Sequence, residues 1–167
     1  MALELRRSTD KDRDVVIGII SECFGDRESY GAYTNIENGR YLLAIEDEKV
    51  IGVSGISATS EYGNNDPEFD FTAVLPGHRR AGVCRALFTE LLKDFHGTVY
   101  YSAWYKHPLS TYPVFNILKE FGFVRVCEPR VGWAVPHNCE YEDTYQCVKY
   151  TGCNCKCFED LWVLNKE

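Results

Sequence analysis

A short basic stretch is the part of the sequence best suited to bind a charged ligand. Arg79, Arg80 and Arg85 surround Gly82, and no acidic residue lies among them. The whole chain has a formal net charge of -7, so this local positive charge stands out. Guanidinium groups bind phosphate oxygens strongly, and a glycine lets a ligand approach the backbone closely. The stretch therefore predicts an anionic ligand with several phosphates; the alternative is an ordinary solvated loop.

An acidic segment precedes this basic stretch. Residues 61–70 contain four acids and no base, namely Glu61, Asp66, Glu68 and Asp70. Because this segment runs into the strand that ends at the basic stretch, the two opposite charges can line one cleft. Such a cleft would suit a second, cationic ligand such as an amine, whereas a solvated loop would show no preference for a partner.

The basic stretch lies between a predicted strand and a predicted helix. The residues from Phe69 to Leu75 are mostly aromatic, β-branched or apolar, which is typical of a half-buried strand. After Gly82 the apolar residues recur with helical spacing, at Cys84, Leu87, Phe88, Leu91, Leu92 and Phe95. The turn therefore begins a helix, where unpaired backbone N–H groups and the helix dipole favour an anion.

The segment from Pro76 to Cys84, PGHRRAGVC, resembles the Gln/Arg-x-x-Gly-x-Gly/Ala signature of the GNAT acyltransferase superfamily. Arg79 takes the first place and Gly82 the fourth, while Cys84 replaces the usual Gly or Ala at the sixth. In that family this turn holds the pyrophosphate of acetyl-coenzyme A (acetyl-CoA), which is thus the implied co-substrate. The resemblance also implies that a backbone N–H near Val74 or Leu75 polarises the thioester carbonyl. The implied cofactor-binding residues are Val74, Leu75, Arg79, Arg80, Ala81, Gly82, Val83, Cys84 and Arg85.

Acetyl transfer to an amine requires a base, because a lysine-like amine has a pKa of about 10.4 and is mostly protonated at neutral pH. Asp70 is the candidate, since it lies four residues before Val74, where family members often carry a catalytic Glu. Glu68 has the same strand parity and is the reserve. The alternative for Asp70 is a solvated carboxylate at the end of a strand.

A general acid could protonate the thiolate that leaves. The segment from Leu118 to Val126, LKEFGFVRV, also resembles the family pattern of helix, Gly-Phe and strand, but Leu118 stands where the usual catalytic Tyr is found. Tyr112 is the substitute candidate, although it lies six residues from position 118 and thus on another helix face. Solvent, or no acid at all, is equally acceptable because a thiolate leaves readily.

The chain has 8 cysteines, and five of them fall near its C-terminal end. With His137, these five could supply the ligands of a structural zinc ion: Cys139, Cys147, Cys153, Cys155 and Cys157. Their spacing lacks the C-x2-C pair that makes a zinc site specific, and cysteines two apart on a strand share a face. We favour small packing residues over zinc ligands, and expect no metal requirement.

The rest of the chain predicts an α/β (α+β) fold of GNAT type, with a mixed, largely antiparallel central sheet flanked by helices. Gly52 and Gly55 indicate a bulge or a close backbone contact in a hairpin strand. Tyr30 and Tyr33 could line a wall of the acceptor site or simply pack. The remaining predicted strands are at 3–7, 41–46, 49–58, 98–105, 123–135 and 158–164. One further predicted helix has Val15, Val16, Ile19, Ile20 and Cys23 on one face. Another is capped by Ser110, has Pro113 in its first turn and carries Val114, Phe115, Leu118 and Phe121.

Length and composition limit the class of protein further. The 167 residues fit a single domain over 1–167, with a Cys-rich insertion at about 137–156 before the last strand. No stretch approaches the roughly 18 apolar residues of a membrane span, and Met1–Arg7 is not a signal peptide. We therefore expect a cytoplasmic protein without a membrane partner. The acidic balance, with a pI near 5.1, argues against nucleic-acid binding; a homodimer is left open.

The sequence thus leads to one main functional hypothesis. It is an N-acetyltransferase that moves an acetyl group from acetyl-CoA directly to an amine, which is expected to belong to a cationic small molecule. The first alternative is a non-catalytic acyl-CoA-binding sensor or structural module, and the second is a zinc-stabilised interaction module. Polyamines, aminoglycosides, amino acids and protein N-termini are all left open as acceptors.

Overall fold

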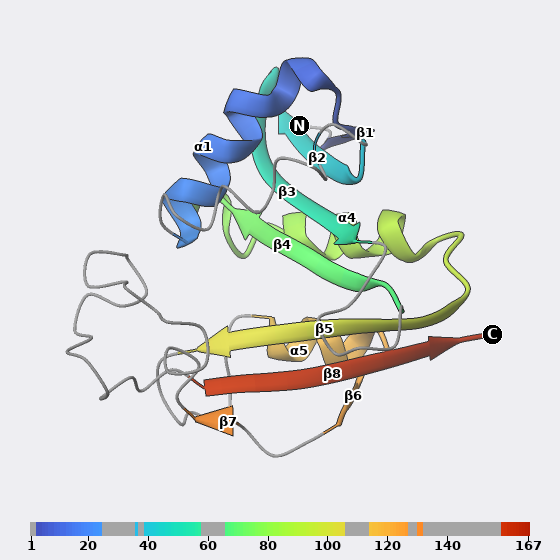
Figure 1. The fold of residues 1–167 in the computed structure, drawn as a ribbon. Helices are drawn as coiled ribbons and strands as arrows, with labels where there is room; N and C mark the ends of the chain where they lie inside the picture. Colours follow the sequence, from blue (N-terminus) through green and yellow to red (C-terminus); the bar gives the residue numbers. More distant parts are fainter. Residues whose placement is uncertain are drawn as a thin grey trace. The chain divides into compact units, whose positions relative to one another are not determined.

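The computed structural model describes residues 3–24, 36, 39–57, 66–105, 114–126, 130–131 and 158–167 (Figure 1). Two compact units make up the chain, Met1–Phe95 and His96–Glu167. The first unit contains the predicted cofactor turn and Asp70, and the second contains Leu118.

Four antiparallel strands form the sheet of the first unit, in the order β1 (Glu4–Arg7), β2 (Tyr41–Glu46), β3 (Lys49–Ser57) and β4 (Glu68–Val74). The β2–β3 hairpin confirms the prediction, and its two turn residues, Asp47 and Glu48, have φ values of 48° and 64°. Left-handed backbone at both central positions is the geometry of the tight turns that match the twist of paired strands.

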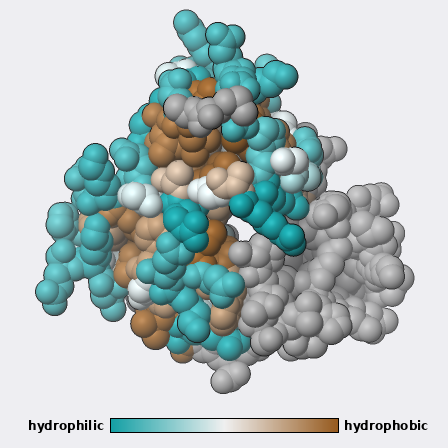
Figure 2. Space-filling model, turned by 180° about the vertical axis from the view of Figure 1, so that it is seen from behind, coloured by the Kyte–Doolittle hydropathy of each residue, from teal (hydrophilic) through white to brown (hydrophobic). Residues whose placement is uncertain are grey.

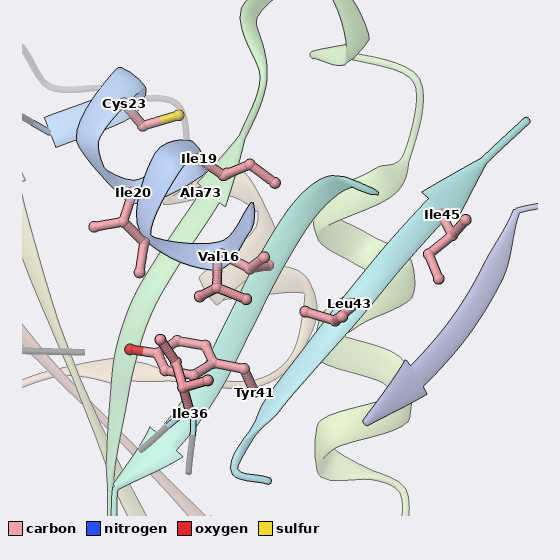
Figure 3. Close-up of a cluster of buried hydrophobic side chains, with 10 residues drawn as sticks. Val16, Ile19, Ile20, Cys23, Ile36, Tyr41, Leu43, Ile45 and Ala73 are labelled. Carbon is pink, nitrogen blue, oxygen red and sulfur yellow. The ribbon is translucent and has the colours of Figure 1, made fainter. Parts of the chain in front are cut away.

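Two helices cover opposite faces of this sheet, α1 (Arg13–Phe24) and α4 (Val83–Leu92), each preceded by a short 3-10 turn, η1 (Asp10–Asp12) and η3 (Pro76–His78) (Figure 1). On the α1 side lies a cluster of buried side chains from α1, β2, β3 and β4 (Figure 3). We name it the α1 cluster; its buried members are Val16, Ile19, Ile20, Cys23, Ile36, Tyr41, Leu43, Ile45, Val53 and Ala73.

The predicted apolar faces of the two helices are confirmed, with one correction in each helix. Val15 is 45% exposed, because it stands one residue, about 100° of helix rotation, before the buried Val16. In α4, Val83 is buried while Cys84 is only half-buried, and the helix ends at Leu92, before Phe95. The buried face of α4 therefore begins with the residue directly after Gly82.

A bulge separates two parts of β4. Ser54 pairs with Thr72 and Ile56 pairs with Phe69, so Asp70 and Phe71 both stand opposite Gly55. Phe69 stacks on Phe88 of α4, with 4.5 Å between ring centroids, whereas Phe71 packs against the α1 cluster. An unbroken strand would point residues 69 and 71 to the same face. The extra residue thus changes the face to which the later β4 side chains point. The sequence predicted a bulge or close contact in β3, and here the extra residue lies in β4, opposite Gly55 of β3.

The second unit is built around a long antiparallel pair, β5 (Gly97–Tyr105) and β8 (Phe158–Lys166). Two short strands, β6 (Val124–Arg125) and β7 (Arg130–Val131), also pair with β8. The predicted strand over 123–135 is therefore two short pieces in its described part. Helix α5 (Phe115–Glu120) lies against β5 and β8 (Figure 1), and its Leu118 is fully buried.

Polar residues project from much of the face seen in Figure 2, with hydrophobic areas between them. Among the described residues, the large hydrophobic side chains that stay exposed are Val15, Val124 and Val126. In the part of the chain that the structure describes, no helix has both the length and the apolar character needed to cross a membrane.

Candidate functional site

The predicted cofactor turn joins β4 to α4 in the first unit. After η3 the backbone is left-handed at two nearby positions, Arg80 with a φ of 65° and Gly82 with a φ of 84°. Glycine adopts this geometry without strain, but an arginine does so at a cost. The strained position is typical of a loop whose shape matters to its function.

The N-terminus of α4 is open toward a ligand. Its first intrahelical hydrogen bond runs from the Ala86 N–H to the Gly82 carbonyl, at 3.0 Å. The N–H groups of Val83, Cys84 and Arg85 precede that bond and so have no carbonyl in the helix to donate to. Within the described residues no side chain caps this end, and no residue other than the chain neighbours of Gly82 has an atom within 4 Å of where a Cβ on Gly82 would stand. This arrangement fits an anion such as a pyrophosphate.

The strand end before the turn is held by a side chain rather than left loose. Arg79 Nε donates to the Val74 carbonyl at 2.9 Å, and the Cys23 thiol donates to the same carbonyl at 3.6 Å. Arg79 Nη2 also lies 3.8 Å from Cys23 Sγ. The Arg79 guanidinium therefore folds back onto β4 and α1, so that its observed contacts are with protein rather than at the α4 N-terminus.

The two backbone N–H groups predicted to polarise a thioester differ in direction. The Leu75 N–H donates to the Ile51 carbonyl at 2.9 Å and is thus engaged in the sheet. Because hydrogen-bond direction alternates along an antiparallel strand, the N–H and carbonyl of Val74 point away from β3. Of the two N–H groups, the one of Val74 therefore points away from the β2–β3 hairpin.

The other predicted residues of the turn have separate surroundings. His78 Nδ1 lies 3.0 Å from Glu46 Oε2, which ties η3 to the β2–β3 hairpin. Arg80, Ala81 and Arg85 are exposed. Burial raises the pKa of the Cys84 thiol to about 12, so it is a neutral thiol at physiological pH and not a nucleophile.

Asp70, the predicted base, is half-buried and accepts a hydrogen bond from the Tyr41 hydroxyl at 2.5 Å. Burial, and then the charge of Asp70, raises the pKa of the Tyr41 phenol, which therefore stays protonated as the donor. Asp70 lies four residues before Val74, about 13 Å along an extended strand. Sequence reasoning missed Tyr41; its only signal was a tyrosine in the otherwise apolar run YLLAI.

Several predicted residues lie outside the described part of the chain: Tyr30, Tyr33, Tyr112 and the cysteine cluster with His137. Leu118, at the position of the family's usual Tyr, is fully buried and carries no hydroxyl. Among the described residues there is no group of three or more His, Cys, Asp or Glu that could hold a metal ion.

A groove of about 410 Å³ lies at the other end of α4, lined by Arg7, Gly39, Arg40, Ile56, Glu90, Leu91, Asp94 and Phe95. Its lining mixes two basic and two acidic side chains. It holds neither the helix N-terminus nor Asp70, so the groove is separate from the chemistry predicted here.

Comparison with known proteins agrees with the predicted fold and family. The model of the acetyltransferase (GNAT) family matches residues 13–108, more than half of the chain. The chain therefore belongs to the GNAT acetyltransferase family and is an acyltransferase. The predicted fold class is confirmed: a mixed α/β fold with a mostly antiparallel sheet.

Solved structures of similar fold are distant in sequence. A GNAT-family acetyltransferase from Bacillus cereus is 15% identical with a TM-score of 0.71, covering 100% of this chain and 99% of its own. Diaminobutyrate acetyltransferase from Paenibacillus lautus, solved with L-2,4-diaminobutyric acid and coenzyme A, is 15% identical with a TM-score of 0.66, covering 98% and 95%. The ribosomal-protein-S18-alanine N-acetyltransferase from Escherichia coli is 14% identical with a TM-score of 0.66, covering 98% and 93%. No curated protein sequence matches.

Proposed function

We propose that this chain transfers the acetyl group of acetyl-CoA directly to the amine of a cationic small molecule. The observation that carries the proposal is the α4 N-terminus, where Gly82 is left-handed and its carbonyl accepts the first intrahelical hydrogen bond, from the Ala86 N–H. That geometry, beside exposed Arg80 and Arg85, is what a pyrophosphate requires.

Each residue of the turn has a distinct part in this proposal. Backbone N–H groups of Val83, Cys84 and Arg85 bind the pyrophosphate, and the Arg80 and Arg85 guanidinium groups add charge from its open side. Arg79 instead keeps the Val74 carbonyl in place, which fixes the direction of the Val74 N–H. When bound, acetyl-CoA supplies an acyl thioester whose carbonyl that N–H polarises.

The amine is deprotonated before or during attack. Asp70 accepts its proton, directly or through water, and the free nitrogen attacks the carbonyl carbon. The C–N bond forms as the C–S bond breaks, and the thiolate takes a proton from solvent or from Tyr112. No electron is gained or lost, and this transfer requires no metal.

We infer a cationic acceptor amine from the acidic residues at and just before β4. Asp66 lies just before β4, Glu68 and Asp70 lie in its first half, and Asp70 accepts a hydrogen bond from the Tyr41 hydroxyl. A carboxylate at this point attracts an ammonium group and orients it. The Paenibacillus lautus neighbour, whose structure contains the diamine diaminobutyric acid, supports such an acceptor.

We also propose a cytoplasmic protein that has no nucleic-acid or membrane partner. The net charge of -7 supports this, because it repels polyphosphate backbones everywhere except at the local basic turn. Sedimentation measurements would show whether the chain forms a homodimer.

Calorimetric titration with coenzyme A tests the binding half of the proposal. Gly82→Ala is expected to weaken binding about tenfold or more, since a Cβ makes left-handed backbone unfavourable by about 1–2 kcal/mol and shifts the N–H groups. Gly77→Ala is the matched control, because Gly77 lies in the same turn with open space around it and no positive φ. Equal binding by both variants would contradict the proposed anion site.

Thiol release from acetyl-CoA tests the catalytic half, with spermidine, kanamycin, L-lysine, L-2,4-diaminobutyrate and an alanine-initiated peptide as acceptors. Asp70→Asn is expected to lower kcat by about 100-fold or more on the accepted amine, the usual contribution of a general base. Coenzyme A binding without thiol release on any amine would favour the non-catalytic sensor.

A further inference from the structure

Tyr41 and Asp70 meet across an intervening strand. Tyr41 belongs to β2 and Asp70 to β4, and β3 lies between these strands in the sheet. The Tyr41 ring therefore has to cross β3 for its hydroxyl to come within 2.5 Å of Asp70 Oδ2. Figure 3 shows the ring lying within the α1 cluster with its hydroxyl toward β4.

Gly55 makes this crossing possible. It pairs with Tyr41 in the β2–β3 register and stands opposite Asp70 and Phe71 at the bulge. A Cβ on Gly55 would lie 3.1 Å from Tyr41 Cδ1 and 3.2 Å from Tyr41 Cε1, closer than ordinary contact. The missing side chain thus provides the space in which the ring lies, and the bulge brings Asp70 to the end of that ring.

The side chains around Tyr41 in the α1 cluster are almost all apolar. The Tyr41 side chain is fully buried, and the only titratable groups of the α1 cluster are its phenol and the Cys23 thiol. Helix α1 contributes Val16, Ile19 and Ile20 to this face, and β3 contributes Val53 and the bare Gly55. On β4 the nearest charged residue is Glu68, two positions away. A buried phenol needs an acceptor, and here the acceptor is the proposed base.

We propose that Tyr41 is a positioning residue for Asp70: its hydroxyl, reaching across Gly55, occupies Oδ2 and holds the carboxylate in a fixed orientation for the acceptor amine. This inference rests on the proposed function, in which Asp70 receives the amine proton. Without the phenol the carboxylate would lose a hydrogen-bond donor that favours its charged form and fixes the position of Oδ2. Tyr41 itself would touch neither the amine nor the thioester.

Carbon-13 NMR titration of the Asp70 carboxyl group tests the contact without any acceptor. With aspartate carboxyl carbons labelled and the Asp70 signal assigned from Asp70→Asn, removal of the donor in Tyr41→Phe is expected to raise the titration midpoint by about one pH unit. Ser8→Ala, which removes a buried hydroxyl of the first unit that donates to the Ile36 carbonyl, is the control and is expected to leave the midpoint unchanged. An unchanged midpoint in Tyr41→Phe would overturn the inference.

A double-mutant cycle on the thiol-release reaction tests the positioning role. Tyr41→Phe is expected to lower kcat about tenfold in the native background, with the KM for acetyl-CoA unchanged, and less than twofold in the Asp70→Asn background. An equal loss in both backgrounds would mean a general structural role and would refute the positioning role.

The two tests separate the failure of this inference from that of the proposed function. A full rate in Asp70→Asn, or no turnover by the native protein on any amine, would contradict the proposed base, while a shifted NMR midpoint would still support the Tyr41 contact. Conversely, a large loss in Asp70→Asn with no effect of Tyr41→Phe would leave the base in place and exclude Tyr41. Gly55→Ala, which moves the ring and keeps the phenol, is expected to act in the same direction as Tyr41→Phe.

Discussion

At the scale of single residues, Asp12 shows how strongly neighbouring groups tune one carboxylate. Both of its oxygens accept hydrogen bonds from Arg6, at 2.8 and 2.6 Å, and Oδ2 also accepts from the Thr9 N–H and hydroxyl at 2.8 Å. The Arg6 hydrogen bonds are the main cause that lowers the pKa of Asp12, against the opposing effect of burial. The carboxylate thereby joins β1 to the start of the first helix.

Asp12→Asn is expected to lower the free energy of unfolding by about 1–2 kcal/mol at neutral pH, because an amide cannot accept all of these bonds. Since the pKa of Asp12 is lower in the folded than in the unfolded protein, its contribution is present above about pH 4 and is lost as the pH falls further. Urea unfolding at pH 7 and at successively lower pH measures this. A difference between the two proteins that does not shrink in acid would contradict the explanation.

At the scale of elements, glycines decide how closely helices and strands approach. Gly52 of β3 lies beneath the first turn of α4, where an added Cβ would be 3.0 Å from Val83 Cγ1 and 3.2 Å from the Ala73 carbonyl oxygen. Gly18 of α1 has the opposite surroundings, since it is exposed and no atom lies within 4 Å of such a Cβ. The same substitution therefore has opposite expected effects at these two positions.

Gly18→Ala is expected to stabilise the protein by about 0.5–1 kcal/mol, because alanine favours a helix interior more than glycine does. Gly52→Ala is expected to destabilise by about 1–3 kcal/mol, since the added methyl group overpacks the contact between β3 and α4. Chemical unfolding of the two variants beside the native protein measures both effects. Destabilisation by Gly18→Ala would show that α1 is constrained in a way the present contacts do not explain.

At the scale of the whole molecule, each compact unit contains its own buried core and its own ion pair. The first unit has the α1 cluster and the Arg6–Asp12 pair. The second has a core that includes Val99, Leu118 and Trp162, and an Arg125–Asp160 pair at 2.6 Å in which Asp160 is buried. Neither of these sets requires a metal ion to complete it.

We therefore expect a metal chelator to leave the melting temperature unchanged, and elemental analysis to find no stoichiometric zinc. Coenzyme A at about 100 times its Kd is the positive control, expected to stabilise the folded state by about 2.7 kcal/mol through mass action. Unfolding on addition of chelator would support zinc binding by the cysteines between Cys139 and Cys157, which lie outside the described residues. The single domain over 1–167 also stays a prediction.

Elements set by local pattern could be predicted well. The strand-like residues before Pro76 predicted β4, and the helical spacing of apolar residues after Gly82 predicted α4. The charged turn from Glu46 to Lys49 predicted the β2–β3 hairpin. Each of these patterns depends on residues only a few positions apart. The predicted strand over 123–135 was less successful, since its described part forms only the short β6 and β7. Strand length depends on what the partner strand offers, which a local pattern does not contain.

The sequence by itself determined the family resemblance, the basic turn with Gly82 and the acidic approach to β4, because these are properties of residue type and close spacing. Only the tertiary structure decided that Arg79 contacts Cys23, 56 residues away, and that Tyr41 contacts Asp70, 29 residues away. The Tyr41 contact depends on strand register and on the bulge opposite Gly55, which rotates side chains between faces. The Arg79 contact depends on how α1 packs against the end of β4. Register is set by the whole packed sheet, and no short segment of sequence specifies it.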